Sequence, residues 1–227
     1  MTSRAAAVLV ALIILADAFP AAPVSAAQPL VVVVFGDSIA AGTGLPEAQR
    51  SNVWVGRVEQ LARGRLRMVN EGAGGRATGA LGDFDAMLGR RPRIDILVLA
   101  LGTNDSADVS GAAPVRAAAN LREIVLRARK AYGRELAVLI VAPPNIRKDA
   151  LLRNREQADQ RERTLERMSA EFRELAARLG CEFLSLYGTV PDASLAVDGM
   201  HPDLAGNERI ARIVLPKLMS IAGARGA

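Results

Sequence analysis

The chain has 227 residues, of which 50% are apolar, 23% charged and 4% aromatic, and its formal net charge is +5. This length suits one domain with a full hydrophobic core, and the composition excludes a collagen-like or a low-hydrophobicity disordered protein. One cysteine and one histidine cannot supply an internal disulfide or a Cys/His zinc site. We therefore expect no metal and no other cofactor, and a histidine-based mechanism has a single candidate base, His201.

The basic residues do not follow the pattern of a nucleic-acid-binding surface. The densest basic runs, at residues 63–67 and 90–93, contain no aromatic side chains on which bases could stack. Many other arginines alternate with acids, as over residues 153–174, which is typical of a solvated helix face. The sequence therefore predicts no nucleic-acid partner, and it leaves open a weak attraction to anionic membrane surfaces.

The N-terminus has the three-part pattern of a secretory signal peptide. A short basic start ends at Arg4, an apolar run covers residues 5–16, and small residues follow up to Ala27. The apolar run is shorter than the roughly 20 residues that span a bilayer, so a membrane anchor is the weaker alternative. We expect a signal peptide over residues 1–26, with cleavage after Ala26 or Ala27. The mature domain, residues 27–227, would then be secreted or periplasmic, without stable membrane insertion.

From residue 29 onward, short runs rich in β-branched residues alternate with helical patterns. The short runs predict strands over residues 30–35, 66–70, 94–101, 136–142 and 182–186. The helical patterns cover residues 53–63, 80–88, 114–132, 155–179 and 204–221, the last with a bend near Pro216. This alternation predicts an α/β fold, a three-layer α/β/α sandwich around a five-stranded parallel sheet with flavodoxin-like strand order.

Polar and glycine residues follow each predicted strand, at the sheet edge where ligands bind in such folds. Gly36, Asp37 and Ser38 follow the first strand, and the later loops carry Gly75, Asn104, Asn145, Asp198 and His201. The sequence therefore predicts a functional site at this edge.

Three of these residues have the chemistry of nucleophilic catalysis. A serine hydroxyl needs a base within hydrogen-bond reach, and an imidazole such as that of His201 works near neutral pH. Asp198 stands three residues before His201, close enough on a turn to hold its imidazole in one tautomer. Each residue alone also has a structural interpretation, with Ser38 as a helix cap, His201 as a structural histidine and Asp198 as a turn former.

Nucleophilic attack on a carbonyl also needs donors for the developing oxyanion. The backbone N–H groups of Ser38 and Gly75 and the side-chain amide of Asn104 are the candidates. Alternatively, Asn104 is a turn former, and the glycines of residues 72–75 form a phosphate cradle. The second alternative lacks the spacing of the known phosphate-binding motifs.

Together these segments resemble the GDSL, or SGNH, hydrolase family. The resemblance rests on four blocks in order and covers essentially the whole mature chain, at Phe35–Ile39, Asn70–Thr78, Leu101–Asp105 and Asp198–Pro202. The first block departs from the family name at Ile39, which stands in place of leucine. The segment 43–46 and Trp54 are similar to the small bacterial arylesterase, thioesterase and lysophospholipase branch.

The resemblance implies a three-layer α/β/α fold and metal-free hydrolysis of esters or thioesters. It assigns Ser38 as nucleophile, His201 as base and Asp198 as the acid that orients the base. The oxyanion donors would be Ser38, Gly75 and Asn104, and Asp37 would organise the nucleophile turn.

We therefore expect a secreted esterase for a small-molecule ester with a short or medium acyl chain, aryl esters included. A carbohydrate O-deacetylase is the nearest alternative, although only Trp54, Tyr132 and Tyr187 could stack on a sugar. A non-catalytic ligand-binding module is the alternative from another class. The loop after residue 142 is expected to shape the substrate pocket or close over it, and Arg76, Arg147 and Lys148 are either contacts for an anionic substrate or solvated. The sequence does not indicate the oligomeric state.

Overall fold

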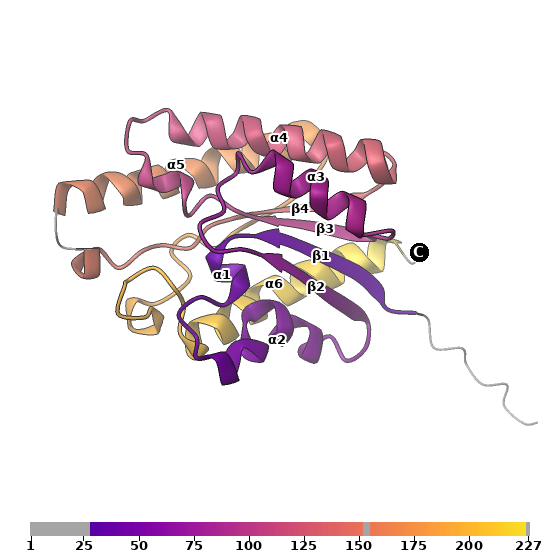
Figure 1. Ribbon diagram of the computed structural model, residues 1–227, viewed down its shortest axis with the longest axis horizontal. Coiled ribbons are helices and arrows are strands. Elements are labelled where there is room, and N and C mark those ends of the chain that lie inside the picture. Colours follow the sequence, from indigo (N-terminus) through magenta and orange to yellow (C-terminus); the bar gives the residue numbers. More distant parts are fainter. Residues whose placement is uncertain (1–27, 152–154, 226–227) are drawn as a thin grey trace, which may run out of the picture.

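The computed structural model describes residues 28–151 and 155–225, in which a parallel sheet lies between two layers of helices (Figure 1). The expected signal peptide, residues 1–26, lies outside the described residues. Within the described ranges the sheet has five strands in the order β2-β1-β3-β4-β5. The strands are β1 Leu30–Gly36, β2 Leu66–Gly72, β3 Ile96–Ala100, β4 Ala137–Ala142 and β5 Glu182–Ser185. This is the predicted α/β sandwich with flavodoxin-like order.

The helices divide between the two faces of the sheet. Helices α3 (Leu81–Arg90), α4 (Ala113–Tyr132) and α5 (Arg155–Leu179) cover one face (Figure 1). Helices α2 (Trp54–Leu61) and α6 (Leu204–Arg225) cover the other, together with the four-residue helix α1 (Ser38–Ala41). The sequence predicted all of these except α1. A helix this short follows its strand directly and has no hydrophobic period of its own.

The sequence of strand β1 is apolar without a break because helices cover both faces of the sheet. Val32 and Val34 face the core under α2 and α6, whereas Val33 and Phe35 face the core under α3, α4 and α5. Successive side chains of a strand point to opposite faces, so a strand covered on both sides needs apolar residues at every position.

The helix ends follow the signals in the sequence. Pro114 lies in the first turn of α4, where its missing N–H costs no hydrogen bond. Gly180 follows α5 with φ +59°, and the next N–H, of Cys181, donates to the carbonyl of Ala176 at 2.8 Å. Helix α6 continues through Pro216 to Arg225, beyond its predicted end, and its residue Ile221 still packs in the core.

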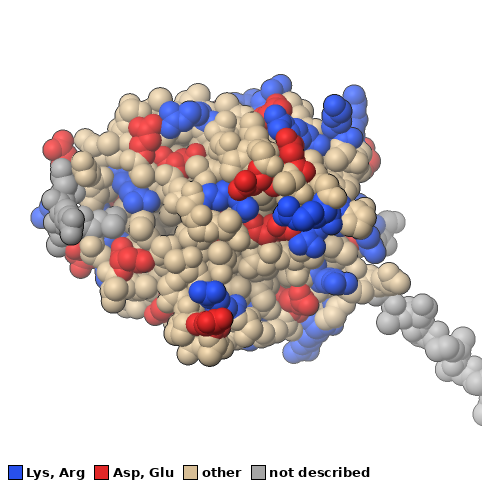
Figure 2. Space-filling model, in the orientation of Figure 1, with Lys and Arg blue, Asp and Glu red and all other residues tan. Residues whose placement is uncertain are grey.

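Basic and acidic side chains are intermingled on the face shown in Figure 2. Pairs one turn apart lie on three helices, Arg127 with Glu123 at 2.8 Å, Arg178 with Glu174 at 3.4 Å and Arg212 with Glu208 at 2.7 Å. These pairs agree with the interpretation of the arginines as part of solvated helix faces. In the described part of the chain, no helix combines the length and apolar character needed to cross a bilayer.

Candidate active site

The nucleophile turn is built from close backbone packing at the end of β1. Ser38 lies two residues after the strand and is 7% exposed, at the start of α1. Asp37 caps this helix, with its Oδ1 accepting the N–H of Ile39 at 2.9 Å. A Cβ on Gly36 would lie 2.5 Å from the Cβ of Ala40, so only glycine lets the turn fold back this tightly. The turn therefore fixes the Ser38 hydroxyl at the carboxyl edge of the sheet.

His201 comes from the other end of the chain and meets Ser38 at this edge. Its Nε2 lies 2.9 Å from Ser38 Oγ, across 163 positions of sequence, and its Nδ1 lies 2.6 Å from Asp198 Oδ2. An ionised carboxylate only accepts hydrogen bonds, so Nδ1 donates to Asp198 and Nε2 accepts from the Ser38 hydroxyl. The three side chains thus form one continuous hydrogen-bonded chain.

Asp198 is held in its ionised form by its neighbours. Burial pushes the pKa of Asp198 up, but hydrogen bonds from the His201 imidazole and from the N–H groups of Met200 and His201 outweigh burial and hold that pKa below its usual value. The two backbone N–H groups donate to Oδ1 at 2.9 and 3.0 Å, which leaves Oδ2 for the imidazole. At neutral pH, His201 therefore faces a charged carboxylate.

The segment that carries Asp198 and His201 is a long connection between β5 and α6. The N–H of Ala196 donates to the carbonyl of His201 at 2.7 Å, which closes the segment into a tight loop. The N–H of Arg147 donates to the carbonyl of Gly199 at 2.7 Å and joins this loop to the one after β4. Gly199 has φ +69°, and a Cβ there would lie 2.6 Å from the Cβ of Ala150 and 2.7 Å from the carbonyl oxygen of Arg147.

The predicted oxyanion donors lie on three neighbouring loops. Strand β2, which precedes the Gly75 loop, pairs with β1 up to Gly36, so this loop starts beside the nucleophile turn. The Asn104 amide donates to the carbonyl of Arg76, the residue after Gly75, at 3.0 Å. Gly75 has φ +74° and no atom within 4 Å of the position of a Cβ, which leaves open space above its backbone.

Asp105, which the sequence interpretation did not assign, joins the same two loops. Its carboxylate accepts the N–H of Thr78 at 2.9 Å and the Thr78 hydroxyl at 2.6 Å. Asn120 of α4 donates to that hydroxyl at 3.1 Å, and Arg161 of α5 donates to the carbonyl of Thr103 at 2.9 Å. These contacts depend on elements far apart in the sequence, so no local pattern indicated them.

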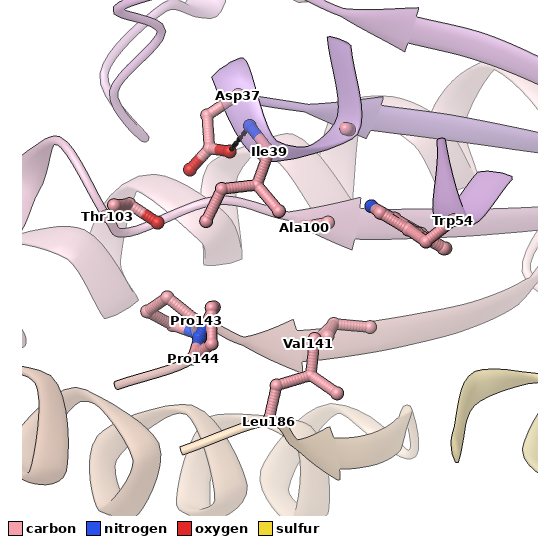
Figure 3. A pocket seen from close by; sticks show the side chains of 10 residues that line it. Asp37, Ile39, Trp54, Ala100, Thr103, Val141, Pro143, Pro144 and Leu186 are labelled. Carbon is pink, nitrogen blue, oxygen red and sulfur yellow. Dashed lines mark hydrogen bonds between the residues drawn. The ribbon is translucent and has the colours of Figure 1, made fainter. Parts of the chain in front are cut away.

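A small cavity of about 20 Å³ lies behind the nucleophile turn (Figure 3). This volume corresponds to about one water molecule. Asp37 Oδ2 and Thr103 Oγ1, both at its wall, are buried without a hydrogen-bond partner among the described residues. Burial raises the pKa of Asp37 from 3.8 to about 6, against the opposing effect of the Ile39 N–H. The apolar part of the wall consists of Ile39, Ala40, Trp54, Ala100, Val141, Pro143, Pro144 and Leu186.

Arg147 and Lys148, which the sequence left as either substrate contacts or solvated cations, bind other parts of the protein. The Arg147 guanidinium donates to the carbonyls of Leu195 and Val197 at 3.3 and 3.4 Å. The Lys148 ammonium pairs with Asp159 at 3.1 Å and with Glu162 at 2.7 Å. Arg147 thus joins the loop after β4 to the segment that carries Asp198, and Lys148 joins the same loop to helix α5.

Comparisons with known proteins give the same fold and a family. The solved structure of a carbohydrate acetylesterase family member from Sinorhizobium meliloti matches with a TM-score of 0.73 and 19% identity, covering 86% of this chain and 99% of that one. A proposed arylesterase from Agrobacterium tumefaciens matches with a TM-score of 0.70 and 26% identity, covering 85% and 99%. The aryl esterase of M. smegmatis matches with a TM-score of 0.71 and 20% identity, covering 84% and 99%.

No curated protein sequence matches the chain. The model of the GDSL-like lipase/acylhydrolase family matches residues 34–209, a span that starts within β1 and ends in the second turn of α6. This span contains Ser38, Gly75, Asn104, Asp198 and His201, and it covers well over half of the chain. The chain therefore belongs to the GDSL-like lipase/acylhydrolase family.

Proposed function

We propose that this protein hydrolyses carboxylic esters of short or medium acyl chains, aryl esters included, through an acyl-enzyme on Ser38. The observation that carries the proposal is the 2.9 Å contact between Ser38 Oγ and His201 Nε2, with Asp198 on the other ring nitrogen. A serine that only capped a helix would not need a histidine from the far end of the chain at its hydroxyl. Membership of the GDSL-like lipase/acylhydrolase family and the esterase neighbours support an ester hydrolase.

The reaction proceeds in two similar halves. Ser38 Oγ attacks the acyl carbonyl carbon while His201 Nε2 takes the hydroxyl proton, and Asp198 stabilises the imidazolium that forms. The oxyanion receives hydrogen bonds from the N–H groups of Ser38 and Gly75 and from the Asn104 amide. His201 then gives its proton to the leaving alcohol. Water enters, loses a proton to His201 and cleaves the acyl-enzyme by the same route.

Hydrolysis of p-nitrophenyl acetate by the wild type and by Ser38→Ala tests this function. We expect Ser38→Ala to lower kcat/KM by about 10⁴-fold or more and to leave the melting temperature nearly unchanged. Replacing the exposed Ser51 by alanine is the matched control and should keep the wild-type rate. A Ser38→Ala variant with the wild-type rate would remove the nucleophile from the proposal.

A substrate panel separates the proposed esterase from a carbohydrate O-deacetylase. p-Nitrophenyl acetate, p-nitrophenyl octanoate and acetylated xylan are compared at equal enzyme concentration. Turnover of the p-nitrophenyl esters above that of acetylated xylan supports the esterase. Preferred release of acetate from xylan would assign the deacetylase instead.

We also propose that residues 1–26 direct export. The supporting observation is the order of basic, apolar and small residues before Ala27. Expression of the full chain in a bacterium, followed by mass spectrometry of the protein from the periplasm or medium, should give a mature N-terminus at Ala27 or Gln28. An uncleaved chain that stays in the cytoplasm would contradict this.

A further inference from the structure

The side chain of Arg76 lies inside the wall between the nucleophile turn and the Gly75 loop. It is 10% exposed, and its Nη1 donates to the carbonyl of Gly36 at 2.9 Å and to the carbonyl of Glu71. Its guanidinium carbon lies 4.2 Å from the centre of the Phe35 ring. Gly36 and Phe35 immediately precede the Asp37–Ser38 turn, so the Arg76 guanidinium contacts the ends of both β1 and β2.

The backbone of the same residue reaches the third loop. The carbonyl of Arg76 accepts the Asn104 amide at 3.0 Å, and its N–H donates to the carbonyl of Ala73 at 3.3 Å, which closes the turn that contains Gly75. A side-chain amide nitrogen carries two hydrogens, so the bond to Arg76 orients the Asn104 amide and leaves its second N–H for an oxyanion. Arg76 therefore touches the supports of all three proposed donors.

The contacts of Arg76 fit a guanidinium and no other side chain. A planar guanidinium can donate to two acceptors while it stacks on an aromatic ring, whereas an ammonium is a point charge without a flat face. The acids nearby do not account for its burial. Asp83, at 3.4 Å, has a side chain that is 61% exposed, and the carboxylate of Glu71 is bound by Arg90 and Arg91.

Resting on the proposed function, we propose that Arg76 is the positioning residue of the oxyanion hole. Its guanidinium fixes the nucleophile turn against the Gly75 loop, and its carbonyl aims the Asn104 amide. Arg76 does not itself contact the substrate. Its loss therefore weakens stabilisation of the tetrahedral intermediate, and it leaves ground-state binding and the Ser38–His201–Asp198 chain in place.

The test compares Arg76→Met with Arg90→Met. Methionine keeps the length and the contact with Phe35 but cannot donate a hydrogen bond. Arg90 is the matched control, because it binds the Glu71 carboxylate from an exposed position and does not reach the three loops. For p-nitrophenyl acetate, Arg76→Met should lower kcat by about 10- to 100-fold with KM within about twofold, whereas Arg90→Met should keep both constants.

Inhibition by a transition-state analogue distinguishes the positioning of the oxyanion hole from a general structural role. A trifluoromethyl ketone forms a hemiketal oxyanion on the serine, so its inhibition constant for Arg76→Met should rise by the factor by which kcat/KM falls. The pH midpoint of kcat/KM should stay at the wild-type value, because the triad is intact. A wild-type kcat and inhibition constant for Arg76→Met would overturn the proposal. An increase in KM equal to the loss of kcat/KM, with kcat unchanged, would do the same.

Arg76→Lys keeps the inference testable if Arg76→Met does not fold. Lysine retains the charge but lacks the flat face and the fixed donor geometry of a guanidinium, so kcat should fall by about threefold or more with KM unchanged. A lysine variant with wild-type kcat would contradict the role of the guanidinium. Failure of the proposed function looks different, because the wild-type protein would then hydrolyse none of the esters in the panel.

Discussion

The nucleophile turn and the acid–base loop, residues 186–203, meet at one hydrogen bond but are constructed in opposite ways. The turn follows a buried strand directly, and Gly36 leaves no room there for a Cβ. The acid–base loop is a long connection closed by hydrogen bonds such as Ala196 N–H to His201, and its Asp198 side chain is 41% exposed. Backbone packing fixes the nucleophile, whereas loop-to-loop contacts fix the base. Substitutions in the loop should therefore alter activity with a smaller cost in stability than substitutions in the turn.

Removing the base should have the largest effect. His201→Ala deletes the acceptor for the Ser38 proton, so kcat/KM for p-nitrophenyl acetate should fall by about 10⁴-fold or more. The melting temperature should change little, because the loop keeps its backbone bonds and its contact with Arg147. A loss of less than about tenfold would separate His201 from the chemistry.

Removing one proposed oxyanion donor, the Asn104 amide, should have the second largest effect on activity. Asn104→Ala should lower kcat by about 10²- to 10³-fold, with a small change in KM, because the amide acts mainly on the tetrahedral intermediate. Asn120→Ala is the matched control, since it removes an amide that binds Thr78 in the same loop network. If both variants lose activity equally, the effect of Asn104 belongs to the scaffold.

A methyl group at Gly199 tests the contact between the acid–base loop and the loop after β4. The added Cβ meets Ala150 and the Arg147 carbonyl, so the loop must shift, and Gly199→Ala should lower kcat/KM by about 10- to 100-fold. Gly188 has φ +72° and nothing within 4 Å of its Cβ position, so Gly188→Ala carries the backbone strain alone. Steady-state kinetics should show near wild-type activity for Gly188→Ala. Equal losses in the two variants would assign the effect to φ and not to the contact.

The smallest effect on activity is expected for Asp37→Asn. This variant is tested instead by how its free energy of unfolding depends on pH. Because burial raises the pKa of Asp37 to about 6, the folded state binds a proton that the unfolded state has released between pH 4 and pH 6. Ionisation therefore costs the wild type stability as pH rises, by roughly 3 kcal/mol in full. Asparagine can still cap Ile39 but does not titrate.

Denaturant unfolding at pH 4, 5, 6, 7 and 8 measures this difference. The stability of Asp37→Asn relative to the wild type should rise from pH 4 to pH 7 and then level off. A constant difference across this range would show that Asp37 titrates near its usual value.

Features encoded by neighbouring residues could be predicted from the sequence. Continuous apolar runs such as 30–35 predicted the buried strands. Right-handed crossovers left few topologies, among which the flavodoxin-like order was favoured. The Asp198–His201 contact is a local turn, so a three-residue spacing was enough to suggest it. Helix α1 escaped because four residues carry no period, although Asp37 as a cap and Gly42 at φ +80° mark its two ends.

The supports of the site were beyond the sequence for a different reason. Arg76 binds the carbonyls of Gly36 and Glu71, and Arg147 binds those of Leu195 and Val197. Every residue presents the same backbone carbonyl, glycine and proline included, so a contact to a carbonyl does not depend on which residue its partner is. The catalytic and oxyanion roles stay predictions that the experiments above address.

Labelling with a fluorophosphonate probe, followed by mass spectrometry of the intact protein and of its peptides, shows whether Ser38 is a nucleophile activated by His201. The probe reacts with a serine that a base has activated. We expect one adduct per chain, located on Ser38, and much slower labelling of His201→Ala. Absence of an adduct from the wild type, or equally fast labelling of Ser38 in His201→Ala, would contradict this expectation.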